Sequence, residues 1–264
     1  MIHGAFDRNR SCALPLLAIV AHLLVGEPQA KASWGWSTAQ VGSALELVYG
    51  SPMLDQLQNS GIVILNESHA PTQTTVIVVG VPRSGTTMIA KALGKMGVFL
   101  GAELDPSISE DIRLANALER SPDSLPGIIE AYNAAHEMWA FKRPTAYQTI
   151  DPGLFRNPRF VVSFRDPVAI AKREELSMTF DFREQLSRAT RWSADLAEFA
   201  LRQTVPVMLV SYEKALAKPK KFVSDLASFA GISPTWLQMR AARASIRPSP
   251  ADYVASSQIR FPKK

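Results

Sequence analysis

The segment from Pro82 to Thr87 combines the residue types that bind phosphate groups. It reads Pro-Arg-Ser-Gly-Thr-Thr, follows the apolar run 75–79 and leads directly into a helical pattern. Glycine lets the backbone approach an anion closely, and the N–H groups at the start of the following helix point at it. Arginine adds a fixed positive charge, and the hydroxyl groups add donors. The sequence therefore predicts an anion-binding loop made of Pro82, Arg83, Ser84, Gly85, Thr86 and Thr87.

The spacing in this loop argues against ordinary ATP hydrolysis. Four residues separate Gly80 from Gly85, as in a Walker A loop, but Thr86 stands where a nucleotide triphosphatase carries its phosphate-binding lysine. In those enzymes the lysine reaches the terminal phosphates, and the next hydroxyl group helps to hold magnesium. Here the positive charge has moved to Arg83, away from the position of that lysine.

A second candidate, Arg165, follows the apolar run 159–164 and precedes Asp166-Pro167, a strong helix start. If the run is a strand of a parallel sheet, Arg165 lies at the carboxyl edge, where such sheets bind ligands. A guanidinium group can hold a phosphate with two hydrogen bonds. The alternative is a helix-capping role or a surface ion pair with Asp166 or Glu174.

Strand and helix patterns alternate along the chain. The sequence predicts an α/β fold of the P-loop type, a three-layer sandwich with a central parallel sheet flanked by helices. We expect strands at 61–65, 75–79, 97–101, 139–142, 159–164 and 205–211, and helices at 37–60, 86–96, 109–120, 126–138, 166–177, 183–203, 218–230 and 234–244.

Composition limits the class of protein. The 264 residues are 47% hydrophobic, which suits one large domain, and we expect it to span 36–264 after an apolar segment 1–35. The net charge of +5 suits an anionic cofactor or substrate, but it is too small and dispersed to indicate nucleic acid binding. Cys12 is the single cysteine, so the chain has no internal disulfide and no cysteine cluster for a metal.

The N-terminus has the outline of a secretory signal. Arg8 and Arg10 precede the apolar run 12–25, and Ala-Lys-Ala follows at 30–32. The run is short for a bilayer crossing and contains Pro15, so a transmembrane helix is not expected. Two alternatives stay open: an apolar helix packed on the domain, and a start codon placed too far upstream.

The two phosphate-binding candidates resemble motifs of the sulfotransferase family. Pro82 to Thr87 looks like the family's 5′-phosphosulfate loop, whose donor is 3′-phosphoadenosine 5′-phosphosulfate (PAPS). The segment 159–173 is similar to the 3′-phosphate motif, in which an arginine follows the strand and a serine lies eight residues later. The resemblance implies that Arg165 binds the 3′-phosphate, and Arg173, at the serine position, is a candidate to pair with it. It also favours a cytoplasmic location, where the nucleotide donor is made.

Weaker matches extend the resemblance over about 75–232. The run 205–211 with Tyr212-Glu213 resembles a strand that is mainly architectural in the family. Lys142-Arg143-Pro144 resembles the family's Lys-x-Pro element near the transferring sulfonate, which makes Lys142 a candidate catalytic residue. The C-terminal Arg-Lys-Gly element of cytosolic small-molecule sulfotransferases is missing, and its charge would have to come from Arg243, Arg247 or Arg260. The chain thus resembles the divergent bacterial type.

The resemblance implies sulfonate transfer without a metal, and such a transfer needs a base to accept the proton of the acceptor hydroxyl group. The candidates are Glu103, Asp105, Asp111 and His136, and we rank Glu103 first because it follows the expected strand 97–101. The expected acceptor is a carbohydrate or glycolipid hydroxyl, with a peptide tyrosine or a small molecule as alternatives. The apolar N-terminal run would suit a membrane-associated acceptor.

Two other functions stay open. A P-loop kinase that uses Mg-ATP would assign Arg83 to the terminal phosphates and Asp166 to the metal, and Thr86 in the lysine position counts against it. A nucleotide-binding protein without catalytic activity is the second alternative, since a fold does not guarantee activity and position 173 lacks the serine.

Overall fold

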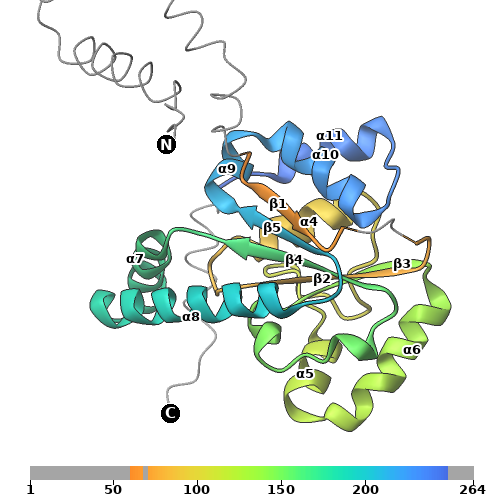
Figure 1. Cartoon of the computed structure of the whole chain (residues 1–264), viewed down its shortest axis with the longest axis horizontal. Helices are drawn as coiled ribbons and strands as arrows, with labels where there is room; N and C mark the ends of the chain where they lie inside the picture. The colour runs from red at the N-terminus through yellow and green to blue at the C-terminus, as the bar shows by residue number, and fades with distance from the viewer. Residues whose placement is uncertain (1–59, 68–70, 249–264) are drawn as a thin grey trace, which may run out of the picture. The chain divides into compact units, whose positions relative to one another are not determined.

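The computed structural model describes residues 60–67 and 71–248 (Figure 1). The expected segment 1–35 and the candidate Arg260 lie outside these residues, and so does the expected helix 37–60 apart from Ser60. Within the described ranges, no helix combines the length and the apolar content that crossing a bilayer requires.

Five strands form one sheet in the order β1-β5-β4-β2-β3. Strand β2 runs parallel to β3 and β4, and β4 runs parallel to β5, as the sequence predicts. The edge strand β1 pairs antiparallel with β5, so the sheet is mostly rather than wholly parallel. An edge strand has one neighbour and needs no crossover helix to reach it, so its direction is less constrained. The strands are β1 (Ile62–Leu65), β2 (Thr74–Gly80), β3 (Met138–Lys142), β4 (Pro158–Phe164) and β5 (Val207–Ser211).

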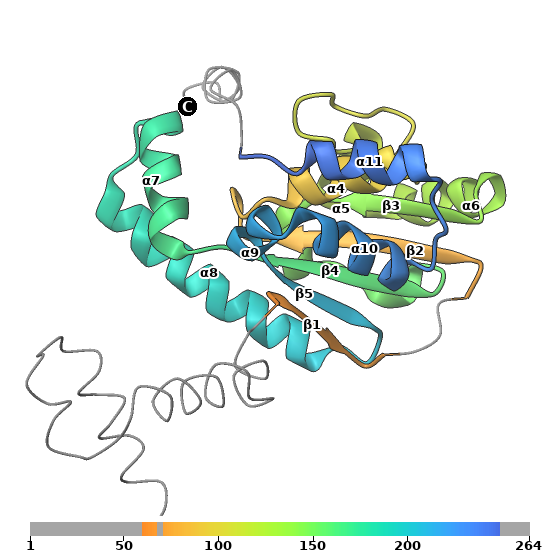
Figure 2. The same ribbon diagram turned by 90° about the horizontal axis from the view of Figure 1, so that it is seen from above.

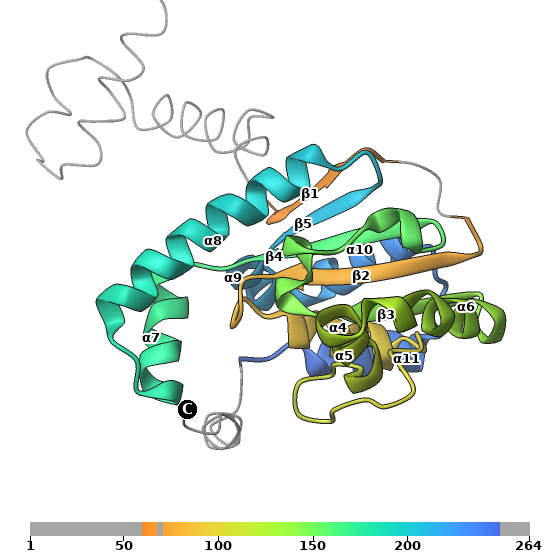
Figure 3. The same cartoon turned by 90° about the horizontal axis from the view of Figure 1, so that it is seen from below.

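Helices cover both faces of the sheet, because alternate strand residues point to opposite sides. Ile77 and Phe160 pack with apolar residues of α5, α6, α7 and α8, whereas Val76 and Val161 pack with those of α4, α9, α10 and α11. Figures 2 and 3 show the arrangement from opposite sides. The helices are α4 (Thr86–Lys95), α5 (Ile112–Arg120), α6 (Leu125–Ala135), α7 (Pro167–Met178), α8 (Phe182–Arg202), α9 (Tyr212–Ala217), α10 (Pro219–Ala230) and α11 (Trp236–Ser245).

Three expectations about local structure are wrong. The segment 97–101 forms no strand beyond one bridge from Phe99 to Trp139, because Gly97 and Gly101 bracket it with positive φ angles of 94° and 135°. The helix expected from 109 begins at Ile112, since the Asp111 side chain caps it. The helix expected to reach 138 ends at Ala135, where the backbone becomes extended and leads into β3.

Candidate functional site

The phosphate-binding candidates and Lys142 lie at the carboxyl edge of the sheet. Strand β2 ends at Gly80 and leads into the expected anion-binding loop 82–87, called the phosphate loop, and β4 ends one residue before Arg165. Lys142 is the last residue of β3, and Tyr212 directly follows β5. Because these four strands are parallel, four segments far apart in sequence end side by side at the edge where α/β folds bind ligands.

The phosphate loop is shaped by glycine and by a buried serine. Gly85, the N-cap residue of α4, has φ 98°, a left-handed conformation that favours glycine. A Cβ atom on Gly80 would lie 2.5 Å from Ser84 Oγ and 2.8 Å from the Ser163 carbonyl oxygen. Ser163 Oγ donates a hydrogen bond of 2.7 Å to the Ser84 carbonyl. The buried Ser84 hydroxyl group has no hydrogen-bond partner within the described residues, so it can donate to a ligand in the loop.

The N-terminus of α4 offers a positive potential to a ligand. No side chain caps this helix, and its first turn contains no acidic residue. The partial charge of the helix dipole is therefore not offset by a carboxylate of the first turn. The buried Thr86 begins the helix, and Thr87 Oγ1 donates a hydrogen bond of 3.2 Å to the Ile108 carbonyl, which ties the loop to segment 105–111.

Arg165 contacts the phosphate loop directly. Its Nη1 donates a hydrogen bond of 2.9 Å to the Arg83 carbonyl oxygen. Its guanidinium carbon lies 4.6 Å from the centre of the Tyr212 ring, and its Nε lies 3.9 Å from Glu213 Oε1. Within the described residues Arg165 thus pairs with Glu213 and not with Asp166 or Glu174, the partners considered as the alternative. Asp166 caps α7 by accepting from Val168 N and Ala169 N. The two phosphate-binding candidates belong to one site.

Glu174 supplies a buried carboxylate beside the loop. Its Oε1 lies 3.5 Å from Arg83 Nε, and its Oε2 accepts a hydrogen bond of 2.6 Å from Arg188 Nη2. The neighbouring Arg173 is partly buried on α7, and Ser177 Oγ donates to its carbonyl oxygen. The role of Arg173 toward a 3′-phosphate stays a prediction.

Lys142 is buried in a polar cluster at the end of β3, with 3% of its surface exposed. Its Nζ lies 2.6 Å from Glu110 Oε1 and donates a hydrogen bond of 3.1 Å to the Ile108 carbonyl. Arg143 Nη1 lies 2.5 Å from Glu110 Oε2. Burial lowers the pKa of Lys142, and the Glu110 charge acts in the opposite direction. The Ile108 carbonyl thus links Lys142 to Thr87 of the phosphate loop.

Glu110 belongs to the polar cluster around Lys142, and the sequence analysis did not identify it as a candidate. Glu103, the predicted base, has an exposed side chain, and its main-chain oxygen accepts from Ile112 N. Glu110, with 6% exposure, is the carboxylate that contacts Lys142. In the sequence it stands next to Asp111, the N-cap of α5, where a glutamate looks like an ordinary surface residue. No signal in the chain marks it before the fold brings it to β3.

The other three candidate bases have structural roles. Asp105 Oδ1 accepts hydrogen bonds from Ser107 N and Ser107 Oγ within its own loop. Asp111 caps α5 and accepts a hydrogen bond from the Tyr132 hydroxyl group. His136 stacks on Phe99 and lies just before β3 begins, at the amino edge of the sheet. Within residues 60–67 and 71–248, no three His, Cys, Asp or Glu side chains are grouped so that they could hold a metal.

The chain matches no protein-family model and no curated protein. It is similar to solved sulfotransferase structures. The sulfotransferase domain of the Synechococcus olefin synthase is 18% identical, with a TM-score of 0.45 over 66% of this chain and 78% of that one. STF9 of Mycobacterium avium is 14% identical, with a TM-score of 0.43 over 91% and 88%. STF1 of Mycobacterium tuberculosis is 14% identical, with a TM-score of 0.41 over 73% and 78%.

Proposed function

We propose that this protein is a PAPS-dependent sulfotransferase that acts on a hydroxyl acceptor. The observation that carries the proposal is the hydrogen bond from Arg165 to the Arg83 carbonyl. It joins a loop suited to a 5′-phosphosulfate to an arginine suited to a 3′-phosphate, and PAPS carries both groups. Thr86 in place of the Walker lysine, together with an Asp166 side chain used as a helix cap, favours this donor over Mg-ATP.

The residues present fit PAPS. The Ser84 hydroxyl group in the loop has no partner within the described residues, and no side chain caps the N-terminus of α4, so an anion can accept hydrogen bonds there. The lack of a Cβ atom at Gly80 makes room for Ser84 Oγ and the Ser163 carbonyl oxygen. The 5′-phosphosulfate would be held by Pro82, Arg83, Ser84, Gly85, Thr86 and Thr87, and the 3′-phosphate by Arg165 with Arg173. The donor supplies an activated sulfonate group. Arg83 and Lys142 supply positive charge where the leaving nucleotide gains negative charge.

Two carboxylates are candidates to accept the proton of the acceptor hydroxyl group. Glu103 is the candidate from sequence, and Glu110 is favoured by its 2.6 Å contact with Lys142. A base must lie within hydrogen-bond reach of the attacking hydroxyl group, so a carboxylate linked to the phosphate loop through Lys142 and Ile108 is well placed. We propose a carbohydrate or glycolipid as the acceptor class, with small molecules as the alternative, and action in the cytoplasm, where PAPS is made.

Calorimetry with the donor product, 3′-phosphoadenosine 5′-phosphate (PAP), tests the donor assignment. We expect micromolar binding by the full-length protein, loss of binding in Arg83→Ala and in Arg165→Ala, and no competition by Mg-ATP. Arg202→Ala is the matched control, because Arg202 is 72% exposed on α8 and pairs only with Glu198 in the described part of the chain. Preference for Mg-ATP would identify a kinase and overturn the proposal.

Turnover separates an enzyme from a nucleotide-binding protein without activity. The protein is incubated with PAPS labelled in the sulfonate group and with a set of carbohydrate, glycolipid and phenolic acceptors. Transfer of the label that Arg83→Ala abolishes supports the proposal. Tight binding of PAP without transfer to any of these acceptors contradicts the proposed activity on them and favours the inactive alternative.

A further inference from the structure

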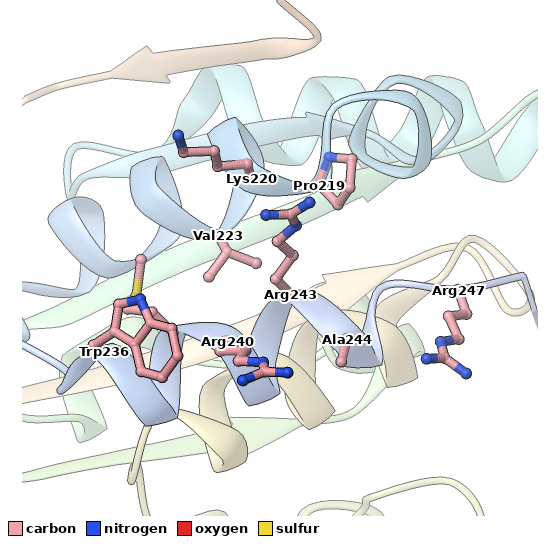
Figure 4. A pocket seen from close by; sticks show the side chains of 9 residues that line it. Pro219, Lys220, Val223, Trp236, Arg240, Arg243, Ala244 and Arg247 are labelled. Atoms are coloured by element: carbon pink, nitrogen blue, oxygen red, sulfur yellow. The ribbon is translucent and has the colours of Figure 1, made fainter.

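A basic groove lies between α10 and α11, on the face of the sheet that α4 covers (Figure 4). Its volume is about 640 Å³. Four cationic side chains line it, together with the apolar Val223 and the indole of Trp236. The cations are Lys220 from α10, Arg240 and Arg243 from α11, and Arg247 from the segment after α11. Arg243 and Arg247 are also the residues considered in the sequence analysis for the charge of the missing Arg-Lys-Gly element, and the structure places both in this groove.

The charge on this face is of one sign. The sequence from 226 to 248 contains three arginines and no acidic residue. Within the described residues, no carboxylate forms an ion pair with any of the four cations. The nearest acidic residue of α10, Asp225, is paired with Lys221 at 2.8 Å. The groove therefore presents a positive potential to an external partner.

The cations share a stripe of helix with an exposed aromatic ring. Trp236, Arg240 and Arg243 are spaced four and three residues apart, so they follow one side of α11. Arg247 lies two residues beyond the end of the helix and lines the same groove. The Trp236 side chain is 70% exposed, and the Arg240 guanidinium group lies 5.4 Å from the centre of its ring. Leu237 beside it is 68% exposed. The core contacts of this region are made by Ala242 within the helix and by Ile246 directly after it, so the exposed apolar residues are not part of the core.

We propose that the α10–α11 face binds the surface of a bilayer that contains anionic lipids. Tryptophan prefers the boundary between headgroups and acyl chains, and a helix with exposed Trp and Leu beside several arginines is typical of an interfacial surface. Arginine side chains bind phosphate groups of lipid headgroups, and a groove of this volume can take a headgroup between the two helices. A soluble acidic partner would match the charge but would leave Trp236 and Leu237 without an apolar environment.

The groove extends toward the carboxyl edge of the sheet. α10 begins at Pro219, shortly after the carboxyl end of β5. It ends near the start of β4, where Arg159 Nη1 donates a hydrogen bond to the Phe229 carbonyl. α11 packs against α4 and is followed by Arg247, and both helices lie along the sheet in Figure 2. If the proposed function holds, lipid bound here would bring a glycolipid acceptor to the protein. Binding to the bilayer does not itself depend on that function.

Vesicle co-sedimentation of the full-length protein tests the proposal. The vesicles contain phosphatidylcholine alone or phosphatidylcholine with phosphatidylserine. A basic residue near an anionic surface contributes roughly a fivefold change in partitioning at moderate salt. We therefore expect Arg240→Ala/Arg243→Ala to reduce partitioning into phosphatidylserine vesicles by about 25-fold. The control, Arg191→Ala/Arg202→Ala, removes the same charge from exposed positions on α8 and should partition like the wild type.

Trp236→Phe provides an independent measurement. Brominated lipids quench tryptophan that enters the interface, and we expect this variant to lose most of the quenching seen in the wild type. Equal loss of partitioning in both double variants would show a general charge effect and overturn the proposal. If the wild type binds phosphatidylcholine vesicles as strongly as vesicles that contain phosphatidylserine, the attachment lies elsewhere in the chain and the proposal is also overturned. Binding of soluble polyglutamate without vesicle binding would assign the groove to an acidic protein. PAP binding is measured on the same samples, so failure of this proposal is distinguished from failure of the proposed function.

Discussion

The Nη1 atom of Arg165 donates a hydrogen bond of 2.9 Å to the main-chain oxygen of Arg83, a residue 82 positions earlier in the chain. Arg83 has φ 70°, an uncommon conformation for a residue with a side chain, so its carbonyl direction depends on such support. Arg165 Nε makes no hydrogen bond within the described residues, although it is buried. The side chain thus supports the phosphate loop through Nη1, while its Nε lies 3.9 Å from Glu213 Oε1.

Arg165→Lys should weaken PAP binding even though it keeps the positive charge. The planar guanidinium group of Arg165 stacks on the Tyr212 ring and donates to the Arg83 carbonyl, and it has further N–H groups for a phosphate. A lysine ammonium group is not planar and cannot make these contacts together. Loss of a hydrogen bond to a charged group costs about 1.5 to 3 kcal/mol, which corresponds to roughly a 10- to 100-fold loss in affinity. Calorimetry with PAP measures this loss, and Arg202→Lys on α8 is the control. Wild-type affinity in Arg165→Lys would contradict the assigned role.

Gly85→Ala should damage both the loop and the stability of the fold. A Cβ atom at this position would collide with the Tyr212 ring, and φ 98° is unfavourable for alanine. The left-handed backbone alone costs about 1 to 2 kcal/mol. The control is Gly127→Ala in α6, where a Cβ atom meets nothing within 4 Å. That change should stabilise the protein by up to about 1 kcal/mol. Urea unfolding with and without PAP compares the two, and equal stability of both variants would contradict the prediction.

The sequence predicts those parts of the fold whose signals are local. Five of the six apolar runs become strands within two residues of the expected limits, and Asp166-Pro167 starts α7 as its residue types predict. The phosphate loop follows from a short motif between a strand and a helix. The same reasoning fails at 97–101, where the apolar residues are right for a strand but Gly97 and Gly101 restrict pairing to one bridge.

The parts that could not be predicted depend on contacts between distant residues. Glu110 and Lys142 are 32 residues apart, and nothing near either one indicates the other. The direction of β1 follows from its place at the edge beside β5, which the apolar pattern of four residues does not encode. The pairing of Arg83 with Glu174 likewise depends on how α7 packs beside the loop. Local chemistry thus identifies the phosphate loop, but the fold decides which carboxylates join it.

The stability of the protein should depend on Tyr132 at high pH. Burial, followed by the hydrogen bond to Asp111, raises the pKa of Tyr132 to about 12. In the unfolded chain a tyrosine loses its proton near pH 10, so between about pH 10 and 12 the folded state binds one proton more. The unfolding free energy therefore falls as the pH rises through this window, and Tyr132 accounts for at most about 3 kcal/mol of that fall. Below about pH 10 the full stabilisation from Tyr132 is present.

Tyr132→Phe removes this dependence because phenylalanine has no proton to lose. The difference in unfolding free energy between wild type and variant should be constant up to about pH 10 and should shrink above it. Urea unfolding at several pH values between about 8 and 11.5 measures that difference. A difference that stays constant across the whole range would show that the Tyr132 pKa is not raised by its surroundings.

Glu110→Gln and Glu103→Gln decide which carboxylate accepts the acceptor proton. Removal of a general base typically lowers kcat by about 10²- to 10⁴-fold. We expect this loss in Glu110→Gln, because Glu110 is the carboxylate in contact with Lys142, and no loss in the exposed Glu103→Gln. PAP affinity should stay close to that of the wild type in both variants, since neither side chain contacts the phosphate loop in the described residues. The measurement is single-turnover sulfonate transfer to an acceptor found in the screen.

The pH–rate profile separates a chemical role of Glu110 from a structural one. Glu110 also balances the buried charge of Lys142, whose pKa burial already lowers, so Glu110→Gln should lower that pKa further and reduce stability. A purely structural role would lower the rate at all pH values in proportion to the loss of folded protein. A base would instead remove the acidic limb of the profile, because the group that must lose its proton is gone. Retention of that limb in Glu110→Gln and its loss in Glu103→Gln would return the role to Glu103.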